Sequence, residues 1–253
     1  MKLFCCFTPA HRLLFDRYFQ PSLPAAFELH ATNIEVAGRG DYYSSEFLEC
    51  IRRKMALVVE SVAANPGELI VWTDIDIVFL ENPLEELRRI AAASPADLFL
   101  QREGRRIESV NTGFMLIRCT PEALAFFQEL QRRLASETHK NEQAVANDLL
   151  FIDHFPVRWE YLPLSFYART HGWPPPQRVF LYHANFTVGP DGIGQKIRQF
   201  EELAWVRKWG GPARLYSVVK RVPGKLWRMV VGDTRGELKV VRGGSGPSPA
   251  PGV

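Results

Sequence analysis

Two carboxylates stand one residue apart where an apolar run ends. Asp74 and Asp76 follow the apolar residues 69–72. Alternate side chains of an extended chain share one face, so both carboxylates are expected to point into the same small space. Without a cation they would repel each other, and oxygen ligands of this kind suit Mg²⁺ or Mn²⁺. An Asp-x-Asp pair is most often a solvated turn, but ligands of open α/β sheets bind where strands end, so the sequence supports a metal site here.

His183 closes a second apolar run, residues 179–182. Taken alone, a histidine in this setting is more often a hydrogen-bonded core residue than a metal ligand. Beside two carboxylates it offers a third ligand, and its nitrogen favours Mn²⁺ over Mg²⁺. We therefore predict that His183 joins Asp74 and Asp76.

Lys54 is a cation on an amphipathic segment. Apolar residues recur at helical spacing over residues 44–64, and the Asn-Pro-Gly sequence at 65–67 stops the helix. Lys54 falls beside the buried stripe of this helix. It either extends its ammonium group to solvent or reaches a phosphate at the sheet edge, and the sequence leaves both interpretations open.

The elements that must position these residues alternate along the chain. Apolar runs predict strands at residues 2–8, 27–36, 69–76, 96–101, 109–118 and 179–183. Amphipathic patterns predict helices at residues 12–19, 84–93, 120–134 and 195–208, and one that begins near residue 141. This order predicts a single α/β domain with a central mixed, Rossmann-like sheet flanked by helices. Gly113 within its strand predicts close approach of a ligand or another backbone. The aromatic residues of 155–167 fit either a core or a platform for a sugar.

Composition divides the chain unevenly. The net charge is +3, but residues 211–242 hold eight Lys and Arg against two Asp and Glu. We predict a body at 1–210, a basic extension at 211–242 and a disordered Gly-, Pro- and Ser-rich tail at 243–253. Apolar residues interleave with the basic ones, so the extension is either an anchor for an anionic membrane surface or a helix and hairpin packed on the body.

Cysteine usage points to a reducing compartment. The four cysteines lack a metal-binding spacing, and neighbours such as Cys5 and Cys6 are poor disulfide partners. No secretory signal or membrane-spanning run is recognisable. We expect a cytoplasmic protein, peripheral at the inner face of the membrane if the extension binds there, with no nucleic-acid partner.

Four sequence pieces in this order resemble a known family. They are Trp-Thr-Asp-Ile-Asp-Ile-Val-Phe at 72–79, Val-Asn-Thr-Gly-Phe-Met-Leu-Ile-Arg at 110–118, Asn-Glu-Gln at 141–143 and Tyr-His-Ala-Asn at 182–185. Together they resemble the metal-dependent GT-A glycosyltransferases, and within them the nucleotide-diphospho-sugar transferases of glycosyltransferase family 77. The resemblance covers residues 1–210. It implies a nucleotide-sugar donor, usually a UDP-sugar, held through Mn²⁺ or Mg²⁺.

The resemblance also implies roles for individual residues. Asp76 matches the direct metal ligand, Asp74 a partner that reaches ribose or metal, and His183 a late third ligand. Lys54 and Lys196 match cations that hold the diphosphate. Thr8 would meet the base and ribose of the donor. The other donor-binding positions are Asn111, Thr112, Gly113 and Asn185. The positions near the reacting sugar are Glu142 and Gln143, together with the two aspartates.

The implied reaction transfers the sugar with retention of its anomeric configuration to a hydroxyl group. The sequence does not define the acceptor that carries this hydroxyl, and a glycan and a lipid-linked acceptor are both candidates. Attack on the same face as the leaving phosphate is expected first, and a covalent intermediate on Glu142 or Asp148 second. One rival is a nucleotidylyltransferase, which would require a Gly-rich basic loop that residues 8–12 do not provide. Another is a non-catalytic nucleotide-sugar or membrane-binding module on the same fold, against which the presence of Asp74, Asp76 and His183 argues.

Overall fold

The computed structural model describes residues 1–36, 45–105, 108–136, 140–187 and 191–220. The chain divides into two units, Met1–Ala204 and Trp205–Val253. The greater part of the predicted basic extension and the whole of the predicted disordered tail lie outside the described residues. The first unit carries every candidate site residue.

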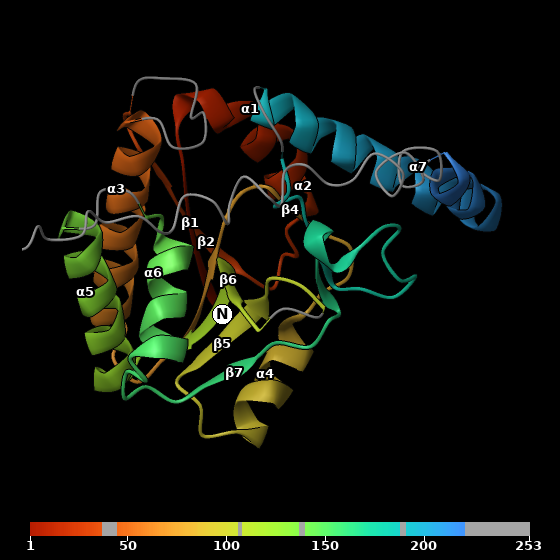
Figure 1. Ribbon diagram of the computed structural model, residues 1–253. Coiled ribbons are helices and arrows are strands. Elements are labelled where there is room, and N and C mark those ends of the chain that lie inside the picture. The colour runs from red at the N-terminus through yellow and green to blue at the C-terminus, as the bar shows by residue number, and fades with distance from the viewer. Residues whose placement is uncertain (37–44, 106–107, 137–139, 188–190, 221–253) are drawn as a thin grey trace, which may run out of the picture. The chain divides into compact units, whose positions relative to one another are not determined.

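A six-stranded mixed sheet forms the centre of the first unit (Figure 1). Strand β1 pairs in parallel with β2 and β3, β6 runs antiparallel between β3 and β5, and β7 lies parallel to β5. The mixed α/β prediction is therefore confirmed. The strands in spatial order are β2 (Glu28–Asn33), β1 (Lys2–Phe7), β3 (Leu69–Thr73), β6 (Val110–Arg118), β5 (Leu98–Arg102) and β7 (Trp159–Tyr161).

A second, three-stranded sheet supplies the other side of the site. Its order is β4 (Ile77–Phe79), β9 (Leu181–His183) and β8 (Phe166–Ala168). The expectation of a single strand through Asp74 and Asp76 is wrong, because the chain leaves the first sheet after Thr73 and enters the second at Ile77. The backbone N–H of Asp74 still donates to Gly113 O at 2.7 Å, and Ile75 then turns into the apolar core. The Asp-Ile-Asp segment is thus the joint between two sheets.

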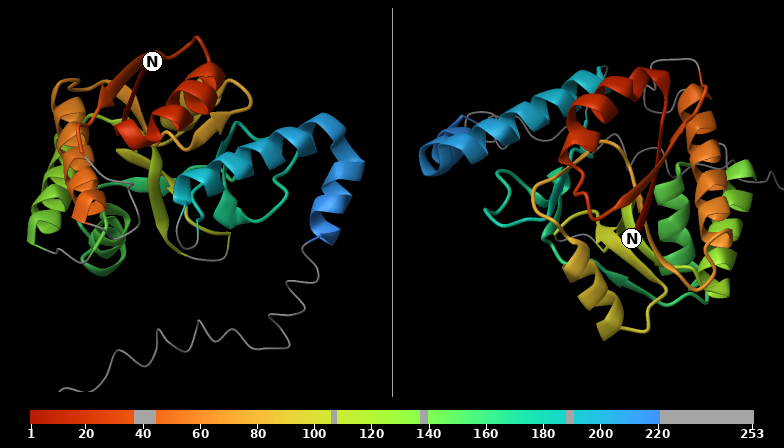
Figure 2. Two further views of the ribbon diagram at one scale, coloured as in Figure 1. Left: turned by 90° about the horizontal axis from the view of Figure 1, so that it is seen from above. Right: turned by 180° about the vertical axis from the view of Figure 1, so that it is seen from behind.

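Helices cover both faces of the central sheet (Figure 2). Each face has its own apolar cluster. On one face α3 (Ser45–Ala63), α5 (Pro121–Ser136) and α6 (Glu142–Asn147) contribute to a cluster with Trp72 and Met115. On the other face α4 (Leu84–Ala93) packs with the three-stranded sheet and with an irregular helical segment that includes α1 (Arg12–Leu14) and α2 (Gln20–Ser22). The predicted helices at 44–64, 84–93 and 120–134 are confirmed to within a few residues.

Helix α7 (Gly192–Val219) extends beyond the predicted 195–208. Its backbone departs from helical geometry at Gly210, where φ is 59°, a left-handed value that glycine tolerates. Pro212 falls just after this break and does not end the helix, because a proline is tolerated in the first turn of a helical piece. Within the described residues, no helix is long and apolar enough to cross a membrane.

Candidate active site

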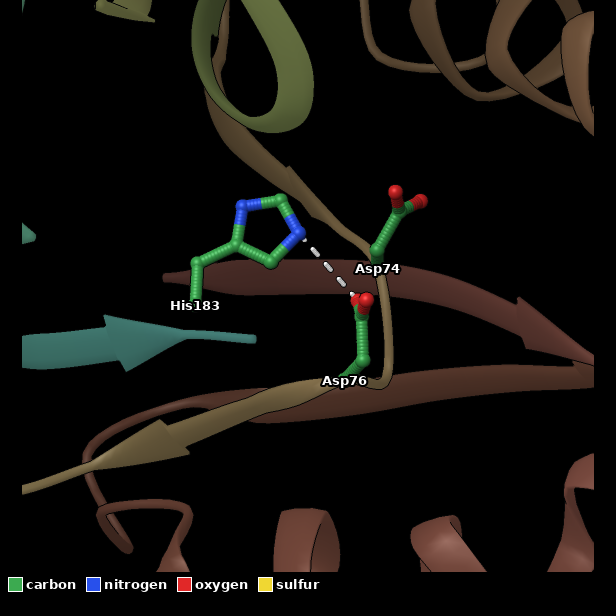
Figure 3. A group of neighbouring side chains, drawn as sticks. All are labelled: Asp74, Asp76 and His183. Atoms are coloured by element: carbon green, nitrogen blue, oxygen red, sulfur yellow. Dashed lines mark ion pairs between the residues drawn. The ribbon is translucent and has the colours of Figure 1, made fainter. Parts of the chain in front are cut away.

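The structure brings Asp74, Asp76 and His183 together, as the sequence predicts. One ligand atom from each lies within 4.8 Å of the others. Asp74 follows β3, Asp76 precedes β4, and His183 ends β9 in the register position opposite Ile77 (Figure 3). The Nε2 atom of His183 lies 3.3 Å from Asp76 Oδ1. Two carboxylates and one imidazole at this spacing could hold a divalent metal ion.

Asp76 is buried between two cationic or polar partners. Only 5% of the residue is exposed, Lys196 Nζ lies 2.6 Å from its Oδ2, and His183 faces its Oδ1. Burial alone would raise the pKa of Asp76, but the neighbouring charges, that of Lys196 foremost, hold the pKa well below its usual value. Asp76 is therefore an anion, the form in which a carboxylate binds metal.

Lys54 faces the acidic centre from α3. It does not extend to solvent: it is buried, and its Nζ lies 2.6 Å from Asp74 Oδ1 and 2.9 Å from Glu142 Oε1. Burial lowers the pKa of Lys54, but the two carboxylates more than offset this, so the net shift is upward and the lysine is a cation. Of the two interpretations left open by the sequence, the structure selects the inward one.

A cavity of about 220 Å³ opens beside these groups. Its charged wall consists of Lys54, Asp74, Asp76, Glu142 and Lys196. Thr8 lies on the wall with His11, which the sequence did not single out, and Thr8 Oγ1 is 2.8 Å from His11 Nδ1. Burial, with help from the nearby Lys196 charge, lowers the pKa of His11 to about 4, so this imidazole is neutral at pH 7. The apolar part of the wall includes Phe7, Leu14, Ile34, Phe47, Ile51, Ile75 and Ile193.

Several predicted donor-binding residues support the site from behind. Among the described residues, the cavity wall does not include Asn111, Thr112, Gln143 or Asn185. Asn111 Nδ2 donates to Glu103 and to Gln143 Oε1, and its Oδ1 accepts from Gly113 N at 2.8 Å. The Nδ2 of Asn185 donates to Thr170 Oγ1 and Glu103. These side chains thus lie outside the described cavity wall, and the donor contacts of Asn111, Thr112 and Asn185 and the place of Gln143 near the sugar stay predictions.

Asp148 lies in a π-helical turn after α6. Its Oδ2 accepts from Lys140 Nζ at 2.6 Å, and it is absent from the described cavity wall. Glu142, by contrast, faces the cavity from the first turn of α6, whose N-cap Asn141 accepts from Ala144 N at 2.8 Å. Of the two carboxylates considered for the reacting sugar, only Glu142 is placed beside the acidic centre.

Gly113 is a point of close approach, but the groups that approach it are side chains and not the predicted ligand or backbone. A Cβ atom at this position would lie 2.3 Å from His183 Cε1 and 3.0 Å from Asp74 Oδ2, far inside van der Waals contact. Only glycine lets β6 pass this close to His183.

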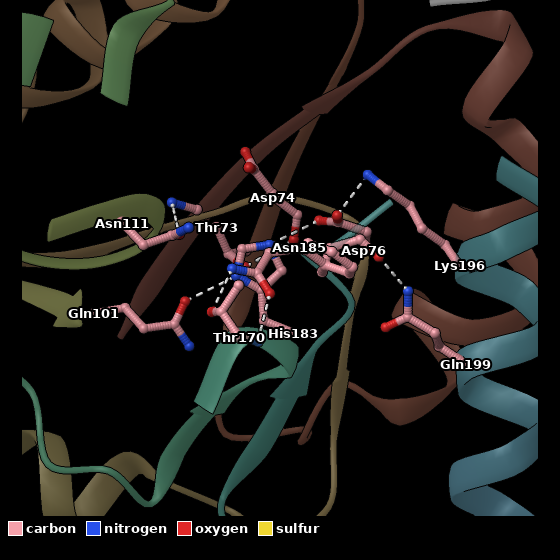
Figure 4. Close-up of polar contacts among 12 residues, drawn as sticks. Thr73, Asp74, Asp76, Gln101, Asn111, Thr170, His183, Asn185, Lys196 and Gln199 are labelled. Atoms are coloured by element: carbon pink, nitrogen blue, oxygen red, sulfur yellow. Dashed lines mark hydrogen bonds and ion pairs between the residues drawn. The ribbon is translucent and has the colours of Figure 1, made fainter. Parts of the chain in front are cut away.

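One buried polar residue was missed altogether. Gln101, at 0% exposure, contacts His183 from β5 (Figure 4). The sequence could have indicated Gln101 by its position two residues after Phe99, within an apolar strand. A glutamine buried at such a position must find a polar partner.

Solved glycosyltransferase structures share this fold. One that is involved in glycosylation of the major capsid of PBCV-1 has a TM-score of 0.56 at 13% identity, over 79% of this chain and 98% of that one. The galactosyltransferase LgtC, solved with donor and acceptor sugar analogs, has a TM-score of 0.50 at 11% identity, over 81% of this chain and 95% of that one. The predicted GT-A architecture is confirmed at the level of fold.

Sequence comparison adds a relative and a family. An uncharacterized protein of Arabidopsis thaliana is 24% identical over 117 residues, which cover 46% of this chain and 34% of that protein. The match thus spans about a third of the length of this curated relative. The family model for nucleotide-diphospho-sugar transferases matches residues 21–200, a range that contains Lys54, Asp74, Asp76, Glu142, His183 and Lys196. The chain belongs to the nucleotide-diphospho-sugar transferase family.

Proposed function

We propose that this chain is a metal-dependent glycosyltransferase that moves a sugar from a UDP-sugar to a hydroxyl acceptor. The observation that supports this best is the convergence of Asp74 and Asp76 with Lys54 and Lys196 on one cavity, where His183 is grouped with the two aspartates. Acidic ligands for a cation and ammonium groups for an anion in the same space suit a metal-bound diphosphate.

The charge balance of the site favours such a ligand. Asp74, Asp76 and Glu142 face Lys54 and Lys196, which leaves one formal negative charge when His183 is neutral. A bound Mn²⁺ or Mg²⁺ would make the site positive and supply charge stabilisation to the leaving nucleoside diphosphate. Asp76 and His183 would hold this cation, with Asp74 as the third ligand or as a partner of the ribose.

The two lysines are suited to different parts of the diphosphate site. Lys196 lies on α7 and partners Asp76, so it is close to the proposed metal position. Lys54 lies on α3 and is held between Asp74 and Glu142. Thr8, on the turn after β1, lines the part of the cavity where we place the ribose and base, next to the apolar wall.

Calorimetry of UDP binding tests the proposal. We expect UDP to bind in the presence of Mn²⁺ and to lose most of its affinity in EDTA. A panel of other nucleotides and nucleotide sugars in a thermal-shift assay identifies the donor, because a ligand that binds only the native state raises its stability. Equal binding of UDP with and without metal would contradict the metal-site assignment.

The same donor assay separates the rival functions. A glycosyltransferase releases UDP when an acceptor is supplied, a nucleotidylyltransferase consumes a nucleoside triphosphate and releases pyrophosphate, and a binding module does neither. We place this chain in the first class because its acidic pair, histidine and lysines lie together.

We further propose retention at the anomeric carbon, with Glu142 as the carboxylate nearest the reacting sugar. Its carboxylate lies 2.9 Å from Lys54 Nζ and faces the cavity, while Gln143 supports Asn111 behind it. Proton NMR of the first-formed product reads the anomeric configuration. An inverted product would make Glu142 a general base instead.

The residue types of the second unit suggest a class of acceptor. Its described part is rich in exposed apolar and aromatic side chains, with Arg207, Lys208, Arg214 and Lys220 and no acidic residue in residues 205–220. This mixture fits an anionic membrane surface at the inner face, so we propose a lipid or lipid-linked glycan as acceptor. The exposed large side chains are Trp205, Trp209, Leu215, Tyr216, Val218 and Val219.

A further inference from the structure

Gln101 is a fully buried glutamine that joins the two sheets at the candidate metal centre. It sits on β5 of the central sheet, and both ends of its amide are engaged with the three-stranded sheet. Its Nε2 donates to the backbone oxygen of Phe166 on β8 at 3.0 Å. Its Oε1 lies 2.8 Å from Nδ1 of His183 on β9 (Figure 4).

These two contacts fix which way the amide faces. A backbone carbonyl oxygen only accepts, so the NH₂ end of Gln101 must lie toward Phe166. The carbonyl end of the amide is then directed at His183. Since an amide oxygen also only accepts, the hydrogen bond at 2.8 Å requires a proton on Nδ1 of His183.

The other ring nitrogen is determined by the same bond. A neutral imidazole carries one N–H, so a proton on Nδ1 leaves Nε2 with a lone pair. Nε2 lies 3.3 Å from Asp76 Oδ1, which also only accepts as a carboxylate. His183 therefore lies between two acceptors, and in its neutral form it has one proton for both of them. If Gln101 did not accept the proton at Nδ1, Asp76 would draw it to Nε2.

We infer that Gln101 is a positioning residue: it accepts the Nδ1–H of His183 and thereby leaves Nε2 as the nitrogen that a divalent cation can bind. The inference rests on the proposed function for the binding of that cation, and not for the contact between Gln101 and Nδ1. A metal-ligating histidine needs its second nitrogen held by an outer partner, and removing such partners typically costs about 10- to 100-fold in metal affinity. Gln101 supplies this partner from a different sheet than the one that carries His183.

The tautomer of His183 can be read directly in the metal-free protein. We propose long-range ¹H–¹⁵N correlation NMR on protein labelled with ¹⁵N-histidine, at a mildly alkaline pH, with His183→Ala to assign the signal among the six histidines. We expect wild-type His183 to carry its proton on Nδ1. In Gln101→Met, a substitution that keeps the length of the side chain but removes its oxygen, we expect the proton on Nε2.

Gln101→Glu separates this role from simple joining of the sheets. Glutamate retains an oxygen toward Nδ1 but, as an anion, loses the bond to Phe166 O. The Nδ1–H form should therefore persist in Gln101→Glu and be lost in Gln101→Met. A residue that only held β5 to β8 would show the same tautomer and the same metal affinity in both variants.

Calorimetry with Mn²⁺ alone gives the second measurement. We expect Gln101→Met to weaken Mn²⁺ binding by about 10- to 100-fold. Gln199→Met is the matched control, because Gln199 is also buried and also bonds a carbonyl and a side chain, Phe186 O and Tyr182 Oη. It should leave the His183 tautomer and the Mn²⁺ affinity near wild-type values.

The outcomes distinguish this inference from the proposed function. Wild-type His183 with its proton on Nε2, or on both nitrogens, overturns the assignment of Gln101, and this measurement requires no variant to fold. An unchanged tautomer in Gln101→Met also overturns it. Failure of wild-type protein to bind Mn²⁺, with the Nδ1–H form intact, would instead contradict the metal-dependent function and leave the tautomer assignment standing.

Discussion

Asp76 combines deep burial with a negative charge, and both of its oxygens face partners in the site. Replacing it with asparagine keeps the shape but removes the charge that Lys196 neutralises. We expect Asp76→Asn to reduce sugar transfer by about 100-fold or more. The metal then lacks one of its anionic ligands, so the charge of the leaving diphosphate is less well stabilised. Initial rates of UDP release measure the loss, and calorimetry shows whether UDP still binds with Mn²⁺.

The control for Asp76→Asn is Asp97→Asn. Asp97 is equally buried and paired, with Arg158 Nη2 at 2.9 Å, but it is not on the cavity wall. Asp97→Asn should lower stability while leaving metal-dependent UDP binding intact. If both variants lose UDP binding to the same extent, the effect of Asp76→Asn is one of folding.

His183 is the nitrogen donor of the proposed ligand set. We expect His183→Ala to weaken activation by Mn²⁺ more than activation by Mg²⁺, because Mg²⁺ prefers oxygen ligands and loses less when an imidazole is removed. Titration of activity with each metal on wild type and variant gives the comparison. A parallel loss for both metals would make His183 a structural residue.

Residue types selected Asp74, Asp76 and His183, and the family resemblance added the two lysines, Thr8 and Glu142. The Asp-x-Asp pair, His183, Lys54, Lys196, Thr8 and Glu142 all lie together in the structure. Sequence could not distinguish cavity-facing side chains from their supports, since Asn111 and Glu142 are equally polar. It also could not find Gln101, whose partners Phe166 and His183 come from distant parts of the chain.

Strand β6 passes so close to His183 that it has no room for a side chain at residue 113. We expect Gly113→Ala to displace the His183 ring and to weaken Mn²⁺ binding by about 10-fold or more, since a new Cβ would lie 2.3 Å from His183 Cε1. Mn²⁺ calorimetry measures this, and urea unfolding measures the accompanying loss of stability. Gly211→Ala, where an added Cβ meets nothing within 4 Å, is the control. Unchanged Mn²⁺ affinity in Gly113→Ala would show that the ring can move without consequence.

Elements with strong periodicity were predicted well, and the division into two sheets was not. Helix α3 and strand β6 match their predicted ranges closely because their apolar spacing extends over many residues. The three-residue strands β4 and β8 are too short to carry a pattern of their own, whereas β9 lies within the strand predicted at 179–183. No local pattern marks the change of sheet at Asp74, because Ile75 and Ile77 continue the apolar run. The strand with which β4 pairs lies near residue 181, far along the chain.

For the whole molecule, we expect the protein to sediment with anionic vesicles at low salt and not with neutral ones. Each Lys or Arg near such a surface contributes about 1 kcal/mol, and the described part of the second unit carries four of them. Trp209→Ala with Leu215→Ala, both at exposed positions, should weaken the association, as should a chain that ends at Gly210. Indifference of the full chain to anionic vesicles would favour a packed basic extension and a soluble acceptor.

The joint between the two sheets also affects how the protein unfolds. Asp74 is tied to the six-stranded sheet through Gly113 O, whereas His183 belongs to the three-stranded sheet. Detachment of the smaller sheet alone would separate these ligands while most of the helical and strand structure persisted. Local unfolding of this kind requires less free energy than global unfolding. Affinity for Mn²⁺ should therefore vanish at urea concentrations where far-ultraviolet circular dichroism is still that of the native protein, which makes metal binding a sensitive reporter of partial unfolding.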